Sequence, residues 1–240
     1  MDTIYILAIE TSATSCSVSI SANGNAGHSL SIDEEKTHAQ KILILVHQLL
    51  EQSQLSMNQI NAISVSSGPG SYTGLRIGVS VAKGLCVALD IPLIAINTLY
   101  GMAMEIIKSF PAFQYYIPMI DARRMEVYTM VVNSIGEVVQ NSHPLILDIE
   151  SYIEVAEGMK TVYFGSGMSK FENIIAKNPL WHYILDIMPV ASQQNFLAYQ
   201  SYLNKEFVNI YSFEPQYLKQ FNLITTYDDS IFYFYYLTSY

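Results

Sequence analysis

The run SSGPGSYTGLRIG, residues 66–78, decides the fold because it is the most restrictive stretch of the chain. It begins at the end of an apolar run, residues 62–66, that predicts a buried strand. It continues into a long apolar run, residues 72–89, that predicts a helix. Glycine allows positive φ and close backbone approach, and Ser71 stands where a side chain caps the first helical turn. The run therefore predicts a strand, a tight loop and a capped helix in succession.

The glycine spacing excludes the two common phosphate-binding loops. A Walker loop has the pattern G-x-x-x-x-G-K-[ST], and a dinucleotide-binding loop has the pattern G-x-G-x-x-G. Here the glycines at 68, 70 and 74 follow neither pattern, and no Lys-Ser or Lys-Thr pair follows them. The residues assigned to a structural loop are Gly68, Pro69, Gly70, Ser71 and Gly74.

Composition indicates a globular protein. Of the 240 residues, 50% are hydrophobic and 14% are charged, which suits one large core or two modest lobes. Cys16 and Cys86 have no CxxC spacing and are expected to be small buried residues rather than a disulfide. The first cation is Lys36, which argues against a signal peptide, and no apolar run reaches the about 18 residues of a membrane span. We expect a cytoplasmic protein without membrane association.

The net charge of −9 argues against a surface that binds nucleic acid unaided. Neutralising phosphates requires clustered Lys and Arg, and the twelve cations are scattered along the chain. If the protein takes part in RNA chemistry, we expect another subunit to hold the RNA.

Hydrophobic periodicity predicts two similar successions of elements. The first comprises strands at residues 4–9, 16–20, 62–66 and 93–96 and helices at 37–51 and 72–89, with an Asn-Gly turn at 23–24. The second comprises strands at 115–120, 126–132, 138–147 and 162–164 and helices near 168–177 and 192–205. A β-β-β-α-β-α order used twice suggests an α/β protein with the two-lobed architecture of actin, hexokinase and acetate kinase (ASKHA).

We divide the chain into three parts on this pattern. Residues 1–110 form the first lobe, and residues 111–222 form a second, smaller lobe whose last helix returns to the first. Residues 223–240 form an atypical aromatic tail, in which residues 231–236 lack charge, proline and glycine. Such a segment is strand-prone and is expected to be covered.

Residues 67–84, SGPGSYTGLRIGVSVAKG, closely resemble the core motif of the TsaB family, bacterial proteins that assist threonylcarbamoylation of an adenosine beside the tRNA anticodon. Further blocks resemble the family in the same order. These are ILAIETSATSCSVSI (6–20), the strand at 91–99, DARRMEVY (121–128) and EPQYLK (214–219). The resemblance is dense in the first half and thin in the second, and it implies the same two-lobed fold.

The predicted helix at 72–89 is apolar on most sides. Its only cations are Arg76 and Lys83, and no anion precedes Asp90. Because one sheet covers one face of a helix, the other apolar face either packs on another helix of the chain or binds a partner. The predicted helix at 37–51 has a similar surplus of apolar residues, and physical reasoning alone leaves both alternatives open.

The resemblance favours the partner. It implies that these two helices pair with the catalytic relative TsaD, or with a second copy of the chain. The implied interface residues are Tyr72, Leu75, Arg76, Val79, Lys83, His38, Ile42 and Val46. On this hypothesis Arg76 and Lys83 flank the contact, and Val79→Asp is expected to abolish partner binding while the monomer stays folded.

A nucleotide enzyme of this architecture would use its two hairpin loops to clamp phosphates around a metal. The candidate nucleotide-binding residues are Glu10, Thr11, Ser12, Asp121 and Arg123. Glu10 could hold a hydrated magnesium ion, and Arg123 and Arg124 could grip phosphate. A turn cap at Glu10 and a hairpin turn in which Asp121 bonds its own backbone explain the same residues, and we favour that structural account.

Metal and peptidase chemistry lack their usual residue patterns. The catalytic relative binds its metal with two histidines four residues apart on a helix, whereas here His38 is followed by Ile42. The other histidines, which have no partner at ligand spacing, are His28, His47, His143 and His182. We predict no metal site, and we find no nucleophile paired with a base.

Together with its resemblance to the TsaB family, the sequence thus predicts a noncatalytic scaffold subunit in tRNA threonylcarbamoyladenosine biosynthesis. Its expected partners are a TsaD-like catalytic subunit, a TsaE-like ATPase and, when alone, a second copy, with tRNA contacted only indirectly. It is expected to hold no cofactor of its own, with ATP and Mg²⁺ at the level of the complex. The alternatives are an autonomous phosphotransferase or nucleotide-binding enzyme, which ATP turnover by the isolated chain would support, and a metallopeptidase-like protein.

Overall fold

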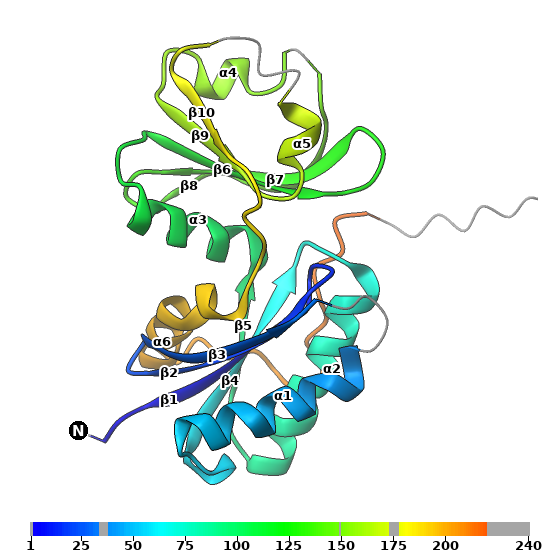
Figure 1. Cartoon of the computed structure of the whole chain (residues 1–240), viewed down its shortest axis with the longest axis vertical. Coiled ribbons are helices and arrows are strands. Elements are labelled where there is room, and N and C mark those ends of the chain that lie inside the picture. Colours follow the sequence, from blue (N-terminus) through cyan, green and yellow to red (C-terminus); the bar gives the residue numbers. More distant parts are fainter. Residues whose placement is uncertain (1, 34–37, 149, 173–177, 220–240) are drawn as a thin grey trace, which may run out of the picture.

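A computed structural model describes residues 2–33, 38–148, 150–172 and 178–219 and contains two five-stranded sheets (Figure 1). The first sheet has the order β3-β2-β1-β4-β5, with β1 (Tyr5–Glu10), β2 (Cys16–Ala22), β3 (Asn25–Ile32), β4 (Ile60–Gly68) and β5 (Leu93–Asn97). The second has the order β10-β9-β6-β7-β8, with β6 (Tyr115–Asp121), β7 (Glu126–Asn133), β8 (Val138–Ile146), β9 (Thr161–Phe164) and β10 (Trp181–Ile184). In both sheets the first strand of the lobe pairs antiparallel with the second and parallel with the fourth.

The helices follow the same order in both halves. They are α1 (His38–Ser53), η1 (Met57–Gln59), α2 (Tyr72–Leu89), α3 (Thr98–Ser109), α4 (Ile153–Ala156), α5 (Met168–Phe171), η2 (Ala191–Gln194) and α6 (Asn195–Asn204). Each half therefore reads βββαβαβα, which confirms the duplicated, two-lobed α/β fold. The elements β3, α3, α4 and β10 go beyond the elements predicted from the sequence, and the predicted tail at 223–240 lies outside the described residues.

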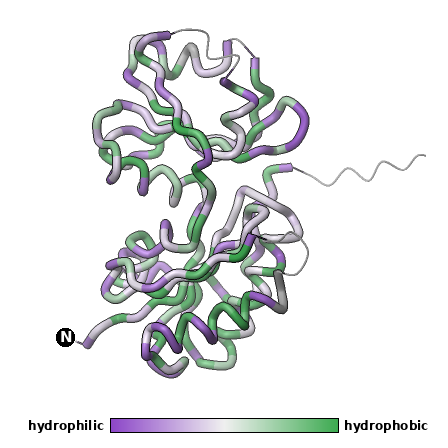
Figure 2. Tube along the Cα trace, in the orientation of Figure 1, coloured by the Kyte–Doolittle hydropathy of each residue, from purple (hydrophilic) through white to green (hydrophobic). Residues whose placement is uncertain are grey.

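Helices α1 and α2 lie side by side on one face of the first sheet (Figure 1). Figure 2 shows stretches of hydrophobic residues along both of them. The core beneath them joins the strands and the helices, and its largest members include Leu7, Ile9, Ile42, Leu49, Ile63 and Leu93. This packing buries one side of each helix.

A buried polar layer joins η2 and α6 to the opposite face of the first sheet. Ser64 Oγ donates to Gln194 Oε1 at 2.8 Å, and Asn195 Nδ2 donates to Ser19 Oγ at 3.0 Å. The backbone N–H of Ala191 donates to Ser17 Oγ at 2.9 Å. Because η2 and α6 return to the first sheet here, Ser17, Ser19 and Ser21 of β2 are buried, although alternating polar residues are typical of a strand with one solvent-exposed face.

Helix α3 lies before residue 110, the predicted end of the first lobe, but it packs on the second sheet. Its apolar side, formed by Leu99, Met102 and Ile106, packs with Tyr116 in the core of the second sheet. Figure 1 shows α3 against the second sheet and α6 against the first, so that these two helices form the layers between the sheets. Packing therefore assigns α3 to the second lobe and α6 to the first.

The glycine corner has the predicted form. Helix α2 begins at Tyr72, and Ser71 Oγ accepts a hydrogen bond from Gly74 N at 3.2 Å. A side chain on Gly74 would overlap the carbonyl oxygen of Thr11, and one on Gly78 would overlap the Thr11 hydroxyl. The β1–β2 loop thus lies directly on the first turns of α2, and glycine is required for that approach.

Helix α2 is also long and apolar enough to cross a membrane, judged by length and composition alone. A helix packed in the core of a globular protein has the same composition. One side of α2 contributes Val79, Ala82 and Cys86 to the core on the first sheet. The length and composition of α2 are therefore only weak evidence for a membrane span.

Both cysteines are free and buried, as predicted. Burial raises the pKa of the Cys16 thiol to about 11 and that of Cys86 to about 12. The thiols are therefore protonated at neutral pH and poorly nucleophilic.

We predict that Gly74→Ala destabilises the protein by about 1–3 kcal/mol, because the added methyl group overlaps the Thr11 carbonyl. Gly84→Ala, on the same helix, is the control, since no atom lies within 4 Å of the added carbon. Alanine there should stabilise by about 0.5–1 kcal/mol through helix propensity. Urea unfolding of both variants measures the difference, and equal effects would contradict the close approach of the β1–β2 loop.

Candidate partner surface and interlobe site

Four of the predicted interface residues lie in the core and not on a surface. Leu75, Val79, Ile42 and Val46 are at most 4% exposed, and the last three pack in the core on the first sheet. The apolar stripes of α1 and α2 point into the same core, as in the alternative in which the two helices pack within one lobe. The expectation for Val79→Asp is therefore wrong, because a carboxylate at this position would be buried without a partner and would unfold the chain.

Other apolar side chains of the same helices remain accessible. Leu43 and Ile44 on α1 are 51% and 54% exposed, and Val87 on α2 is 57% exposed. At the start of α2, Tyr72 is exposed and Arg76 Nη1 donates to its hydroxyl at 3.2 Å. We call these five residues the helix surface.

The other two predicted interface residues differ in position. Lys83 is half-buried on α2. His38 is the first residue of α1, and its side chain lies outside the described part of the structure. Beside Leu43, a shallow groove of about 380 Å³ follows the second half of α1. Its lining comprises Leu43, Val46, His47, Leu50, Glu51, Leu55, Ser56 and Met57.

The first hairpin loop, which holds three candidate nucleotide-binding residues, is closed by its own contacts. Thr11 Oγ1 donates to the carbonyl of Gly74 at 2.8 Å, and Ser71 N donates to the carbonyl of Ser12 at 2.7 Å. Ser12 N donates to Glu10 Oε1 at 2.7 Å. Glu10, Thr11 and Ser12 are all buried, so the loop offers neither the Ser12 amide nor the Thr11 hydroxyl to a phosphate.

Glu10 is a buried carboxyl satisfied by the protein itself. Ser66 Oγ donates to Oε1 at 2.8 Å, and Gln194 Nε2 donates to Oε2 at 3.4 Å. Burial raises the pKa of Glu10 above its ordinary value, although hydrogen bonds from Ser12, Ser66 and Gln194 oppose the rise. The carboxyl therefore has a structural role in joining β1, β4 and η2.

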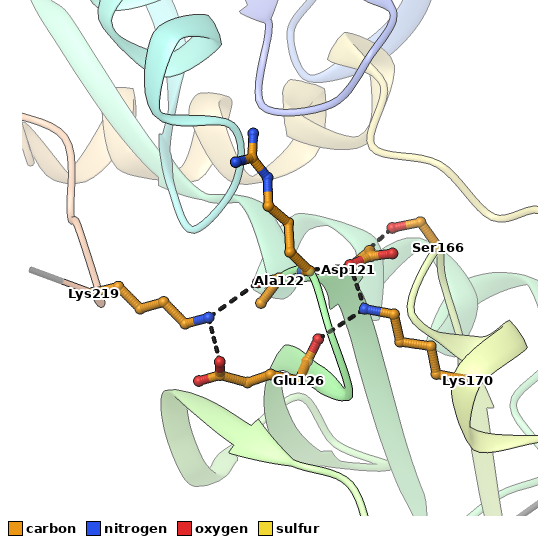
Figure 3. Close-up of polar contacts among 7 residues, drawn as sticks. Asp121, Ala122, Glu126, Ser166, Lys170 and Lys219 are labelled. Atoms are coloured by element: carbon orange, nitrogen blue, oxygen red, sulfur yellow. Dashed lines mark hydrogen bonds and ion pairs between the residues drawn. The ribbon is translucent and has the colours of Figure 1, made fainter. Parts of the chain in front are cut away.

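The second hairpin turn, between β6 and β7, is also engaged internally. Asp121 Oδ1 accepts from Arg123 N at 2.6 Å, the contact that the turn interpretation requires. The same oxygen binds Lys170 Nζ from α5, and Asp121 N donates to Ser166 Oγ at 3.1 Å (Figure 3). The Asp121 carboxylate thus has a cation from its own lobe.

Residues 214–219 connect the glycine corner to this second turn, and we call them the closing strap. Gln216 N donates to the carbonyl of Ser67 at 2.7 Å, and the rings of Tyr217 and Tyr72 lie 4.5 Å apart. Lys219 Nζ then reaches the carboxylate of Glu126 in the second lobe. The strap therefore fastens the two lobes together, a role that the EPQYLK motif did not disclose.

The candidate nucleotide-binding residues thus lie on two separate turns, each held by contacts within the chain. Within the described ranges, no three of His, Cys, Asp and Glu come together as metal ligands. In the β6–β7 turn, the guanidinium groups of Arg123 and Arg124 are exposed and have no hydrogen bond or ion pair within the described ranges.

The topology and the paired hairpins define a protein of the actin-like, two-lobed ASKHA class. The solved structure of the activator of 2-hydroxyisocaproyl-CoA dehydratase from Clostridium difficile has this fold, with a TM-score of 0.51 and 12% identity. It matches 86% of this chain and 99% of its own. At this identity the likeness concerns the fold alone.

Closer relatives identify the family. The profile described as "TsaD: tRNA N6-adenosine threonylcarbamoyltransferase" matches residues 33–219. The tRNA threonylcarbamoyladenosine biosynthesis protein TsaB of Haemophilus influenzae is 30% identical over 91% of this chain and 95% of its own. A Pseudomonas aeruginosa crystal structure, described as similar to peptidase YeaZ, has a TM-score of 0.79 and 26% identity over 90% of this chain and 100% of its own. The chain belongs to the TsaB family, whose named relatives act in tRNA threonylcarbamoyladenosine biosynthesis.

We predict that Glu10→Gln stabilises the protein increasingly as the pH rises above 4.5. Since burial raises the folded-state pKa of Glu10, its favourable contribution is complete below the unfolded-state pKa and is lost as pH rises through the folded-state pKa. A neutral amide at this position does not titrate, and its oxygen still accepts from Ser12 and Ser66. Its NH2 group replaces the oxygen that accepts from Gln194, so the measured quantity is the change of the stability difference with pH. Urea midpoints of both proteins between pH 4.5 and 7.5 provide the measurement. A difference that is constant across this range would contradict the buried, proton-binding carboxyl.

Proposed function

We propose that this chain is a noncatalytic scaffold subunit that binds and stabilises a TsaD-like catalytic subunit through the helix surface. The observation that carries the proposal is the apolar surface left on α1 and α2 after their buried stripes have filled the core. The helix surface has the composition of a protein–protein interface, because it combines three exposed aliphatic side chains with Tyr72 and Arg76. Aromatic residues and Arg are enriched in such interfaces.

The closed hairpin loops support a noncatalytic role. An enzyme of this fold needs free backbone amides and carboxylates to hold phosphates and a metal ion. Here the Ser12 amide, the Thr11 hydroxyl and the Asp121 carboxylate all have partners within the chain. ATP and Mg²⁺ would then be held by the partners, which are a TsaD-like subunit and a TsaE-like ATPase.

Kinship with the catalytic family supports the choice of partner. Because the TsaD profile matches residues 33–219, the match includes α1 and α2 themselves, together with β4 and β5 of the first sheet. Two related lobes can pair through equivalent helices around an approximate two-fold axis, just as identical subunits pair around an exact one. The same surface would pair two copies of this chain when the partner is absent.

We predict that Ile44→Asp and Val87→Asp each weaken binding of the TsaD-like partner at least tenfold, because a carboxylate must then be desolvated in the contact. Phe196→Asp is the matched control, since Phe196 is 56% exposed but lies on α6, on the opposite face of the sheet. Calorimetric titration gives the affinities, and size exclusion with light scattering tests for a one-to-one complex.

All three variants should keep the circular dichroism and unfolding midpoint of the native chain, because each replaces an exposed side chain. Loss of binding in Phe196→Asp together with full binding in the other two would place the contact on the opposite face. A wild-type chain that forms no complex at micromolar concentration, and that turns over ATP alone, would favour an autonomous nucleotide enzyme.

A further inference from the structure

The turn between β6 and β7 has an unusual backbone. Ala122 N donates to the carbonyl of Glu126 at 3.0 Å, and the two residues at its tip, Arg123 and Arg124, have φ of 67° and 51°. Two successive left-handed residues are typical of tight hairpin turns, in which Asn and Gly are preferred. Long side chains are disfavoured in this conformation, so the surroundings must hold the turn in place.

Two lysines from elsewhere in the chain hold it. Lys170 of α5 binds the Asp121 carboxylate and donates to the carbonyl of Glu126 at 3.2 Å. Lys219 of the closing strap binds the Glu126 carboxylate and donates to the carbonyl of Ala122 at 3.0 Å. Figure 3 shows the two ammonium groups approaching the turn from opposite sides.

Because the two lysines pair with the acids of the turn, the guanidinium groups of Arg123 and Arg124 have no ion-pair partner within the described residues. The acids that flank the turn, Asp121 and Glu126, are neutralised by Lys170 and Lys219 and not by the neighbouring guanidinium groups. Arg123 and Arg124 are exposed, and neither side chain has a hydrogen bond or ion pair within the described residues. Two positive charges are therefore uncompensated at one rigid turn of a chain whose net charge is −9.

We propose that the Arg123–Arg124 turn binds backbone phosphates of the tRNA substrate. A guanidinium group donates to phosphate oxygens through a planar pair of N–H groups, and a turn held from both sides loses little conformational freedom on binding. The inference goes beyond the scaffold function, and it departs from the expectation that tRNA is contacted only through other subunits.

An acidic surface on a protein partner is the competing ligand, and the composition of the turn favours RNA. Protein interfaces are centred on apolar and aromatic anchors, whereas phosphate contacts are made by exposed cations that fix position without reading sequence. Beside the two arginines the turn offers one exposed apolar side chain, Met125. Relatives of the chain are named for tRNA threonylcarbamoyladenosine biosynthesis, and tRNA is a polyanion.

The test is the double variant Arg123→Gln/Arg124→Gln, with an unmodified tRNA transcript as the probe. Fluorescence anisotropy over a salt series is measured for the complex with the TsaD-like subunit and for the isolated chain at low salt. We expect tRNA affinity on the order of tenfold lower, and a slope of log K against log salt reduced by about 1.4–1.8, for two lost phosphate contacts. Affinity for the TsaD-like subunit without RNA should not change.

Lys108→Gln/Lys205→Gln is the matched control, because it removes the same charge from two exposed positions outside the turn, one near the end of α3 and one directly after α6. Arg123→Lys/Arg124→Lys should restore most of the salt slope. If the control loses as much tRNA affinity as the arginine variant, the effect is due to net charge alone and the proposal is overturned. Unchanged tRNA binding by the arginine variant would also overturn it. Weakened subunit binding with unchanged tRNA binding would assign the turn to an acidic protein surface. Absence of a complex would contradict the scaffold function, and the tRNA contact would then be decided by the isolated chain, in which unchanged tRNA binding of the double variant would overturn it.

Discussion

The contact between the β1–β2 loop and the first turns of α2 is the constraint on which the rest of the structure depends. Thr11 donates to the carbonyl of Gly74 while its own carbonyl lies where a side chain of residue 74 would stand. This approach requires glycine on α2, closes the first hairpin loop and sets the side of α2 that faces the sheet. One backbone contact thus accounts for the glycine pattern, for the closed loop and for the placing of the helix surface.

The sequence predicted the elements whose signals are local. Periodicity and turn residues predicted the strands of both hairpins, the limits of α2 and the cap at Ser71. Helix α3 had a similar signal that was missed, namely Asn97 as its cap and apolar residues at 99, 102, 103 and 106. Local chemistry therefore sufficed for most of the fold.

Which apolar side chains of α1 and α2 are buried could not be predicted. Both helices are apolar on several sides, so periodicity did not distinguish Val79, which is in the core, from Val87, which is exposed. The serines of β2 were equally ambiguous, because the helix that covers them, α6, comes from the end of the chain. Burial at these positions depends on tertiary contacts, which leave no local pattern.

The electrostatics of the second hairpin turn also arise from distant residues. Lys170 and Lys219 belong to an α-helix and a strap that are far along the chain from Asp121, yet they decide that the turn arginines stay free. On this account the chain is an adaptor with two separate surfaces. One is apolar and lies on the first lobe, the other is basic and lies on the second, and the closing strap fixes one relative to the other.

Hydrogen–deuterium exchange of the chain, alone and with the TsaD-like subunit, tests the central claim most directly. The account predicts that the partner slows exchange within α1 and α2 and leaves α6, on the opposite face of the same sheet, unchanged. Exchange that is unaltered in α1 and α2, or protection confined to the second lobe, would contradict the assignment of the helix surface to the catalytic partner.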